Sequence, residues 1–122
     1  MQYLEVAEGS ITILPDRRDW HDFQTEMHVN YHRAAMTMAG ENIVVTVDAR
    51  DVPFAALLHI KTFAAIAAVV RQEYKNTVRA IVIKDASYVV SKLYSTMCRL
   101  GYIGTLTREK IQFISSQNKK SI

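Results

Sequence analysis

The stretch VRAIVIKDASYVVSKLYSTMCRLGYIGTLTREKIQFI, residues 78–114, decides the predicted fold. It opens with a β-branched run, Val78–Lys84, of the kind found in buried strands. An apolar set then repeats at the spacing of one helix face: Val90, Leu93, Tyr94, Met97 and Cys98. Gly101 is a stop signal for that helix, and Glu109–Ile114 is a second strand-like run. The stretch therefore predicts a strand, a helix from Tyr88 to Leu100 and a strand, which favours a parallel pair.

Similar units precede it along the chain. Tyr3–Ala7 and Ser10–Leu14 are short β-rich runs on either side of Glu8-Gly9, which predicts a hairpin. A helix is expected from Trp20 to Ala39, with Gly40 after its end. Its predicted apolar stripe consists of Trp20, Phe23, Met27, Tyr31, Ala34, Ala35 and Met38.

The middle of the chain supplies a further strand and helix. Asn42–Ala49 reads as a buried strand, and Pro53 suits the first turn of a helix running from Phe54 to about Lys75. That helix is apolar on almost every side, so we expect more than one neighbour to cover it. Phe54, Leu57, Leu58 and Ala65 are expected to meet the sheet.

These elements predict one α/β domain over residues 1–114, with residues 115–122 as a polar tail. The order is ββαβαβαβ, which predicts a mixed, largely parallel sheet of about five strands with three main helices.

Composition limits the class of protein. The chain has 122 residues, a formal net charge of +3 and scattered basic residues, which makes a nucleic-acid partner unfavoured. One cysteine, Cys98, allows no internal disulfide, and we expect it to be a small buried apolar residue. The acidic, alternating N-terminus is unlike a signal peptide, so a cytoplasmic location is expected. His59 and Lys61 at the centre of residues 52–70 favour a core helix over a transmembrane one.

No catalytic constellation is predicted, and neither is a metal or a cofactor. His28 and His32 have the spacing of a metal pair and His21 lies on the same side, but a solvated helix flank is the favoured interpretation. The chain contains no GxSxG, GxGxxG or GxxxxGK[ST] motif. Asp48 and Asp51 follow a strand, where turn formation and helix capping account for them.

Two surfaces are candidate contact sites. Lys84, Lys92 and Arg99 could meet an acidic headgroup or partner. Phe63, Ala67 and Tyr74, on the expected outer side of the long helix, are candidates for contact with a protein partner, a lipid or a second copy of the chain. Cover by the first helix is the alternative.

The second half of the chain resembles the CRAL-TRIO lipid-binding domain. "VVTVDARDV" is similar to that family's first apolar strand, Tyr74 to its tyrosine, "IVIKDASYVVSKLY" to its next strand and helix, and "TREKIQFI" to its close. Lys75 and Ser87 stand where the family has proline, and the chain ends soon after the last strand. The resemblance therefore implies a stripped core without the family's gating helix, in which lipid carriage is less favoured.

The order of elements also resembles a STAS domain. Those domains carry a phosphorylatable serine in the turn before the long helix, whereas "DARDVPF" contains no serine or threonine. The sequence thus predicts a non-catalytic binding module, foremost a protein-interaction or assembly component. The alternatives are a small lipid or membrane-surface binding protein and a STAS-like regulatory domain without the phosphoserine.

Overall fold

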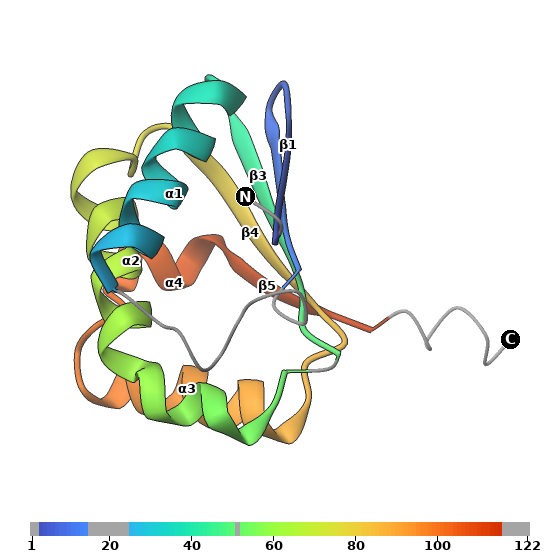
Figure 1. Ribbon diagram of the computed structural model, residues 1–122, viewed down its shortest axis with the longest axis vertical. Coiled ribbons are helices and arrows are strands. Elements are labelled where there is room, and N and C mark those ends of the chain that lie inside the picture. The colour runs from blue at the N-terminus through green and yellow to red at the C-terminus, as the bar shows by residue number, and fades with distance from the viewer. Residues whose placement is uncertain (1–2, 15–24, 51, 116–122) are drawn as a thin grey trace, which may run out of the picture.

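The computed structural model describes residues 3–14, 25–50 and 52–115. They form a five-stranded sheet in the order β1-β2-β3-β4-β5 (Figure 1). Its strands are β1 Leu4–Ala7, β2 Ser10–Ile13, β3 Ile43–Asp48, β4 Val78–Lys84 and β5 Ile111–Ile114. β1 and β2 are antiparallel, and every other pair of neighbours is parallel. The predicted mixed, largely parallel α/β sheet is confirmed.

The helices are α1 Thr25–Ala39, the 3-10 helix η2 Phe54–His59, α2 Ile60–Glu73, α3 Tyr88–Arg99 and α4 Thr105–Lys110. The three predicted main helices are α1, the continuous pair η2 and α2, and α3. Residues 20–24 of the expected first helix lie outside the described residues. The short helix α4 was not predicted, and it contains Glu109 and Lys110, which were expected to begin the last strand. A helix of six residues is too short to show a clear period in the sequence.

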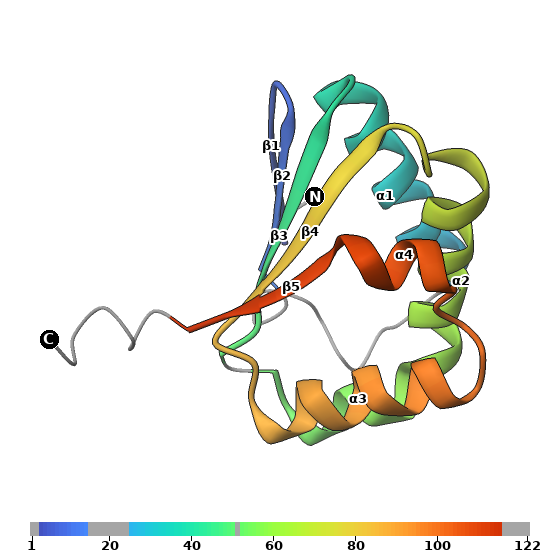
Figure 2. The same ribbon diagram turned by 180° about the vertical axis from the view of Figure 1, so that it is seen from behind.

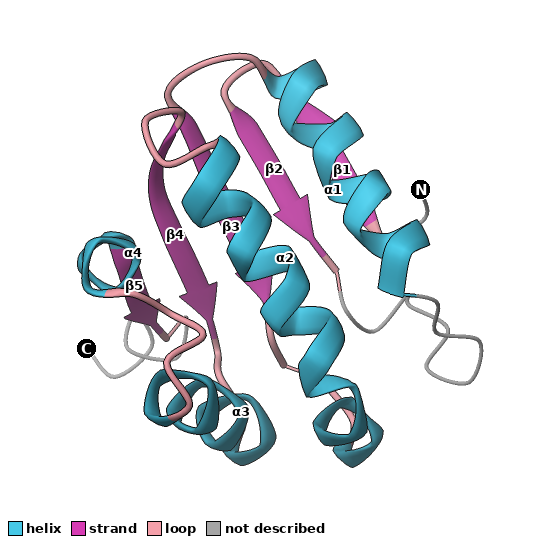
Figure 3. Cartoon of the chain, turned by 90° about the vertical axis from the view of Figure 1, so that its left-hand side faces the viewer, coloured by secondary structure: helices cyan, strands magenta, loops and turns pink. Residues whose placement is uncertain are grey.

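All the described helices lie on one face of the sheet, as Figures 2 and 3 show from two directions. The strand order explains this arrangement. From β2 onward each connection leads to the next strand on the same side, and right-handed crossovers in one direction place their helices on one face. The other face carries small and polar side chains from the middle of the sheet, including Thr12, Thr46 and Val82, which are paired across it.

The best-buried part of the molecule lies between α1 and strands β1 to β3. Ile11 and Ile43 are about 1% exposed or less, and Ala35 of α1 is fully buried against them. Burying an isoleucine side chain of this kind stabilises a fold by roughly 1.5–3 kcal/mol. The hairpin turn is tied to this core, because the amide of Gly9 (φ 72°) donates to the carbonyl of Ala39 at 2.8 Å. A left-handed conformation at that position favours glycine.

The predicted apolar stripe of α1 is confirmed at Ala35, which is buried, and at Tyr31, which packs against the core, but most of the buried positions lie one residue further along. The buried positions are His28, Val29, His32, Ala35, Met36 and Ala39. Met38, which was assigned to the stripe, is 68% exposed. The prediction treated the histidines as polar flank residues, whereas the fold packs both rings near Tyr3. The hydroxyl of Tyr3 lies 2.8 Å from His28 Nδ1, and His32 Nδ1 lies 2.8 Å from the His28 carbonyl oxygen.

Helix α1 also packs beside α2, so α1 covers part of the long apolar helix. Thr25 Oγ1 and Thr62 Oγ1 are 2.6 Å apart, and Arg33 makes a two-pronged ion pair with Glu73 (2.7 and 3.3 Å). Helix α1 therefore covers part of α2. The alternative offered by the sequence was cover by Trp20, Phe23, Met27 and Tyr31, of which Trp20 and Phe23 lie outside the described residues.

Candidate functional site

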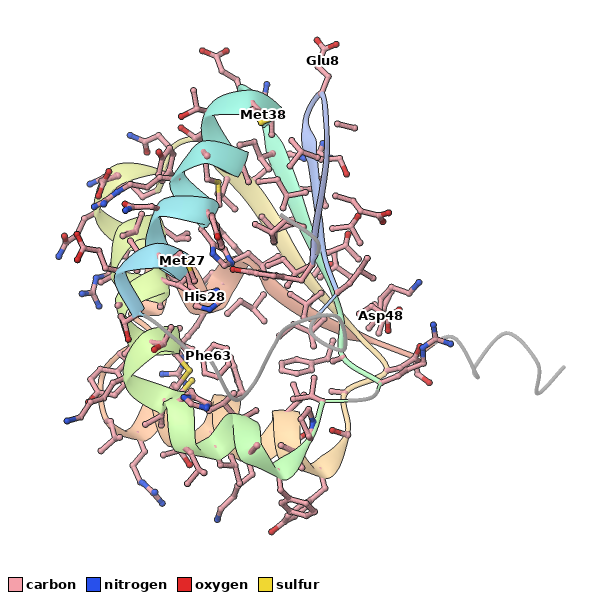
Figure 4. All side chains as sticks on the ribbon, in the orientation of Figure 1. Glu8, Met27, His28, Met38, Asp48 and Phe63 are labelled. Carbon is pink, nitrogen blue, oxygen red and sulfur yellow. The ribbon has the colours of Figure 1, made fainter. Side chains whose placement is uncertain are left out.

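A cavity of about 230 Å³ lies between the helices and the sheet. Val47 and Ile81 of the sheet line one side of it, and Phe63 and Ala67 of α2 line the other, together with Leu93 of α3. Figure 4 shows Phe63 pointing from α2 into the space between the layers. These residues are half-buried, in contrast to the fully buried core beneath α1. We refer to this space as the apolar cavity.

The lining of the apolar cavity is almost free of polar groups. Among its described lining residues, only His32, Tyr94 and Thr107 have polar side-chain atoms, and none is an acid, a lysine or an arginine. Burial raises the pKa of the Tyr94 hydroxyl above its ordinary value, and a hydrogen bond with Arg108 opposes that rise only in part. Tyr94 therefore remains neutral near pH 7. The ring of Tyr94 packs edge-on against Phe113, with ring centroids 5.0 Å apart. This lining suits an apolar ligand and offers few groups to orient a polar one.

The packing around the cavity has a consequence for ligand binding. Its hydrocarbon lining is only partly covered by other protein atoms, because most of the side chains that line it are half-buried. Filling the cavity with an apolar ligand would recover dispersion contacts along its lining.

The predicted contact residues of the long helix lie on its inner side. Phe63 and Ala67 line the apolar cavity, and Tyr74 packs against the buried core cluster. The expected orientation of this helix was thus reversed. Phe54 and Leu58, which were assigned to the sheet side, are 70% and 82% exposed. The error arose because apolar residues surround the helix and alanines leave no clear stripe to orient it.

Lys84, Lys92 and Arg99 were predicted to form one cationic group, but the fold places Lys84 apart from the other two. Lys84 follows the inward-facing Ile83 along β4, so it lies on the open face of the sheet, beside Asp48 on β3. Lys92 and Arg99 are exposed on α3, in the helical layer. The structure therefore brings Lys92 and Arg99 onto one helix and separates Lys84 from them.

Asp48 makes an ion pair, as an ordinary strand-exit residue does. Arg50 donates to both of its carboxylate oxygens at 3.1 and 3.0 Å. These hydrogen bonds hold the pKa of the Asp48 carboxyl below its ordinary value, with Lys84 adding a smaller attraction. Asp51 lies outside the described residues.

The histidines also differ from expectation. His28 and His32 are 4% and 5% exposed and are not a solvated flank, while His21 lies outside the described residues. Within residues 3–14, 25–50 and 52–115, no group of three metal-ligating side chains converges.

Helices η2 and α3 pack together and expose several large side chains. Phe54 and Leu58 of η2 and Tyr88 of α3 are each at least 70% exposed. We call these three residues, with Lys92 and Arg99, the η2–α3 surface. The segment Phe54–Glu73 is also long and apolar enough to cross a membrane, and 17% of its most apolar window is buried. Length and composition alone are weak grounds for a transmembrane assignment, since core helices of soluble proteins share them.

Sequence reasoning missed most of the lining of the apolar cavity and a group of cations beside it. Val47, Ile81 and Leu93 were predicted only as packing residues. Arg71, Lys75 and Lys110 meet at one end of α2, although Lys75 and Lys110 are 35 positions apart. No local sequence pattern indicates that Lys75 and Lys110 lie close together. The only available signal was the prediction that the strands beginning near these two residues are parallel neighbours.

Searches of protein-family models, curated proteins and solved structures found no match to this chain. The resemblance to CRAL-TRIO and STAS domains stays a prediction.

Proposed function

We propose that the protein is a non-catalytic binding module that holds the apolar part of a small lipid-like ligand. The apolar cavity carries this proposal: about 230 Å³ lined almost wholly by hydrocarbon, between the sheet and α2 and α3. Pockets for small ligands are concave and mostly apolar, with a few polar groups. The proposal favours the lipid-binding alternative over the protein-assembly function that the sequence placed first. It retains a minimal CRAL-TRIO-like core as its architecture.

Native mass spectrometry of the full chain tests whether a lipid-like molecule co-purifies. Titration with a neutral, polarity-sensitive dye such as Nile red then measures binding directly. Ala67→Phe places a ring in the cavity and should weaken dye binding at least about tenfold. Ala34→Phe is the matched control, because Ala34 is exposed on α1. Should the wild-type chain bind neither lipid nor dye, or should Ala67→Phe bind the dye as wild type does, the proposal is wrong.

A second candidate function is docking on an anionic membrane, which the η2–α3 surface favours. Residues 52–72 and 86–108 contain no aspartate or glutamate, so every formal charge on η2 and α3 is positive. Exposed Phe54 and Leu58 supply apolar side chains beside those charges. Each cation near an anionic leaflet contributes about 1 kcal/mol. Apolar anchors together with cations are the combination by which peripheral proteins bind membranes.

Vesicle sedimentation tests the docking candidate. We expect the chain to sediment with phosphatidylserine-containing vesicles and much less with neutral phosphatidylcholine vesicles. The double variant Lys92→Glu/Arg99→Glu should abolish sedimentation, whereas Lys84→Glu, on the open sheet face, should not. Equal sedimentation with both vesicle types would contradict the charge argument. No sedimentation, together with a dimer in light scattering that Leu58→Glu dissociates, would assign the surface to a second copy of the chain instead.

A further inference from the structure

A second cavity, of about 300 Å³, lies at the C-terminal end of α2, where β4 and β5 begin. Arg71, Lys75 and Lys110 line it, together with the single acid Glu109, which leaves a net charge of +2 (three cations less one carboxylate). We call it the basic pocket. Lys75 is exposed, so this pocket faces the surface.

We propose that the basic pocket binds the acidic head of an amphiphile whose tail occupies the apolar cavity. This inference rests on the proposed function, because it assigns the other end of the same ligand. The shared chemistry of the head is a carboxylate or a phosphate group, both of which accept hydrogen bonds from arginine and lysine.

The cations are held in place by the backbone. The Lys110 ammonium donates to the carbonyl oxygen of Lys75 and, at 2.8 Å, to that of Val78. Arg71 Nη1 donates to the carbonyl oxygen of Tyr102 at 3.3 Å. Both side chains are therefore oriented before any ligand binds, which reduces the entropy lost on binding.

These contacts leave donors available for a ligand. An ammonium has three N–H groups and a guanidinium has five. The described contacts use two of the ammonium donors of Lys110 and one of the guanidinium donors of Arg71. Capping of the turn after α2 explains why Lys110 lies there, but it does not explain why Arg71 and Lys75 lie beside it.

The basic pocket and the apolar cavity adjoin each other. Val70 of α2, Ile81 of β4 and Thr107 of α4 line both. A ligand that occupies both spaces would pass these three side chains, which lie at the boundary between the cations and the hydrocarbon lining. An arrangement with charge at one end and hydrocarbon at the other matches an amphiphile better than a uniformly apolar or uniformly charged ligand.

The volume of the apolar cavity limits the tail. A cavity of about 150 Å³ in another protein takes up one benzene molecule, which has six carbons, so about 230 Å³ corresponds to a tail of about nine carbons. Decanoate has a carboxylate on such a tail, and decanol has a neutral head on a tail of similar length. Comparing the affinities of decanoate and decanol isolates the contribution of the charged head to binding.

Isothermal titration calorimetry at pH 7, with both ligands below micelle-forming concentration, tests the inference. Decanoate should bind about tenfold more tightly than decanol, because charge-assisted hydrogen bonds are stronger than neutral ones. The double variant Arg71→Gln/Lys75→Gln should remove that preference and leave decanol binding unchanged. Lys110 is left unchanged because it also binds backbone carbonyls. Lys84→Gln on the open face of the sheet is the matched control and should keep the preference.

The outcomes separate the two proposals. If neither ligand binds, the proposed function fails and the inference fails with it. If both ligands bind equally and the double variant changes neither affinity, the proposed binding in the apolar cavity is supported. The proposal that the basic pocket binds an acidic head is then wrong. Inorganic phosphate should compete with decanoate only at millimolar concentration. Phosphate binding as tight as decanoate would show an anion site independent of the tail and would overturn the inference. Should the double variant unfold, Lys75→Gln alone should lose part of the preference.

Discussion

Two regions of the molecule are packed differently. Beneath α1, the layers close on Ile11, Ile43 and Ala35, which are almost fully buried. Beneath α2 and α3, mostly half-buried side chains line the apolar cavity, and Met36 and Val45 belong both to its lining and to the buried core. The helices show the contrast: α1 buries six of its 15 residues, whereas α2 buries two of 14 and α3 two of 12. We infer that tight packing in the first region stabilises the fold, whereas looser packing in the second region leaves space for a ligand.

The largest expected effect compares the same truncation in both regions. Ile43→Ala removes buried carbon atoms from a site that is 0% exposed and should lower the free energy of unfolding by about 4 kcal/mol. Ile66→Ala removes the same atoms from the lining of the apolar cavity and should cost about 1 kcal/mol, because that side chain is only half-buried. Urea unfolding of both variants measures the difference. Equal losses would show that the regions are packed alike.

The second comparison enlarges one alanine side chain in each region and predicts opposite changes in the free energy of unfolding. Ala35→Leu overfills a fully buried site and should lower the free energy of unfolding by about 2 kcal/mol. Ala67→Leu grows into the apolar cavity and should raise it by about 1 kcal/mol. Urea unfolding again reports both values. A loss of stability in Ala67→Leu would mean that the cavity walls cannot accept a larger side chain.

A smaller effect comes from the buried hydrogen bond of the α1 region. Tyr3→Phe keeps the ring but removes the hydroxyl 2.8 Å from His28 Nδ1, and it should lower the free energy of unfolding by about 1 kcal/mol. Tyr88→Phe is the matched control, since Tyr88 is 72% exposed and should be neutral. Thermal unfolding distinguishes the two. A neutral Tyr3→Phe would place the stability of this region in apolar packing alone.

The smallest effect concerns the contact between α1 and α2, where Arg33 forms an ion pair with Glu73. The hydrogen bond from Arg33 holds the pKa of the Glu73 carboxyl below its ordinary value. A carboxyl with a lowered pKa contributes stability above its unfolded-state pKa and loses it as the pH falls through its folded-state pKa. The contribution is therefore present at neutral pH and is lost at acidic pH, as Glu73 becomes protonated.

Carbon-detected NMR titration of Glu73 measures that shift, and Arg33→Gln should return the pKa toward its ordinary value. Unfolding at pH 7 should scarcely change in this variant, because the pair is exposed to solvent. A Glu73 titration unaffected by Arg33→Gln would remove the pair as a link between the helices.

The strands could be predicted because they depend on local sequence. Val78–Lys84 is the same segment in the prediction and in β4, since a β-branched run between turn residues leaves few alternatives. The inward side of α1 could not be predicted, because His28 and His32 are buried against the ring of Tyr3, which the fold brings to them. Contacts that depend on tertiary structure leave no trace in a helical period.

The site was predicted in part. Phe63 and Ala67 were selected as contact residues, but for the outer side of the helix and not for the side that faces the sheet. A cavity depends on the distance between layers, which small differences in side-chain volume determine and hydrophobic patterning does not. The basic pocket was missed because α4 delivers Lys110 to the end of α2, and α4 itself was too short to predict.

The strand order also has a kinetic consequence. Each strand pairs with the strand before it in the chain, but only the β1–β2 hairpin is a short closure. The three parallel pairings close long crossovers, over residues 14–42, 49–77 and 85–110, so we expect the intermediate folding rate of mixed α/β domains. On the ribosome, the hairpin, α1 and β3 can assemble before β5 has been synthesised. β5 joins last, along β4 alone, and its exposed Phe113 and Ile114 add little burial. We therefore expect its amide hydrogens to exchange with solvent first when the folded protein opens.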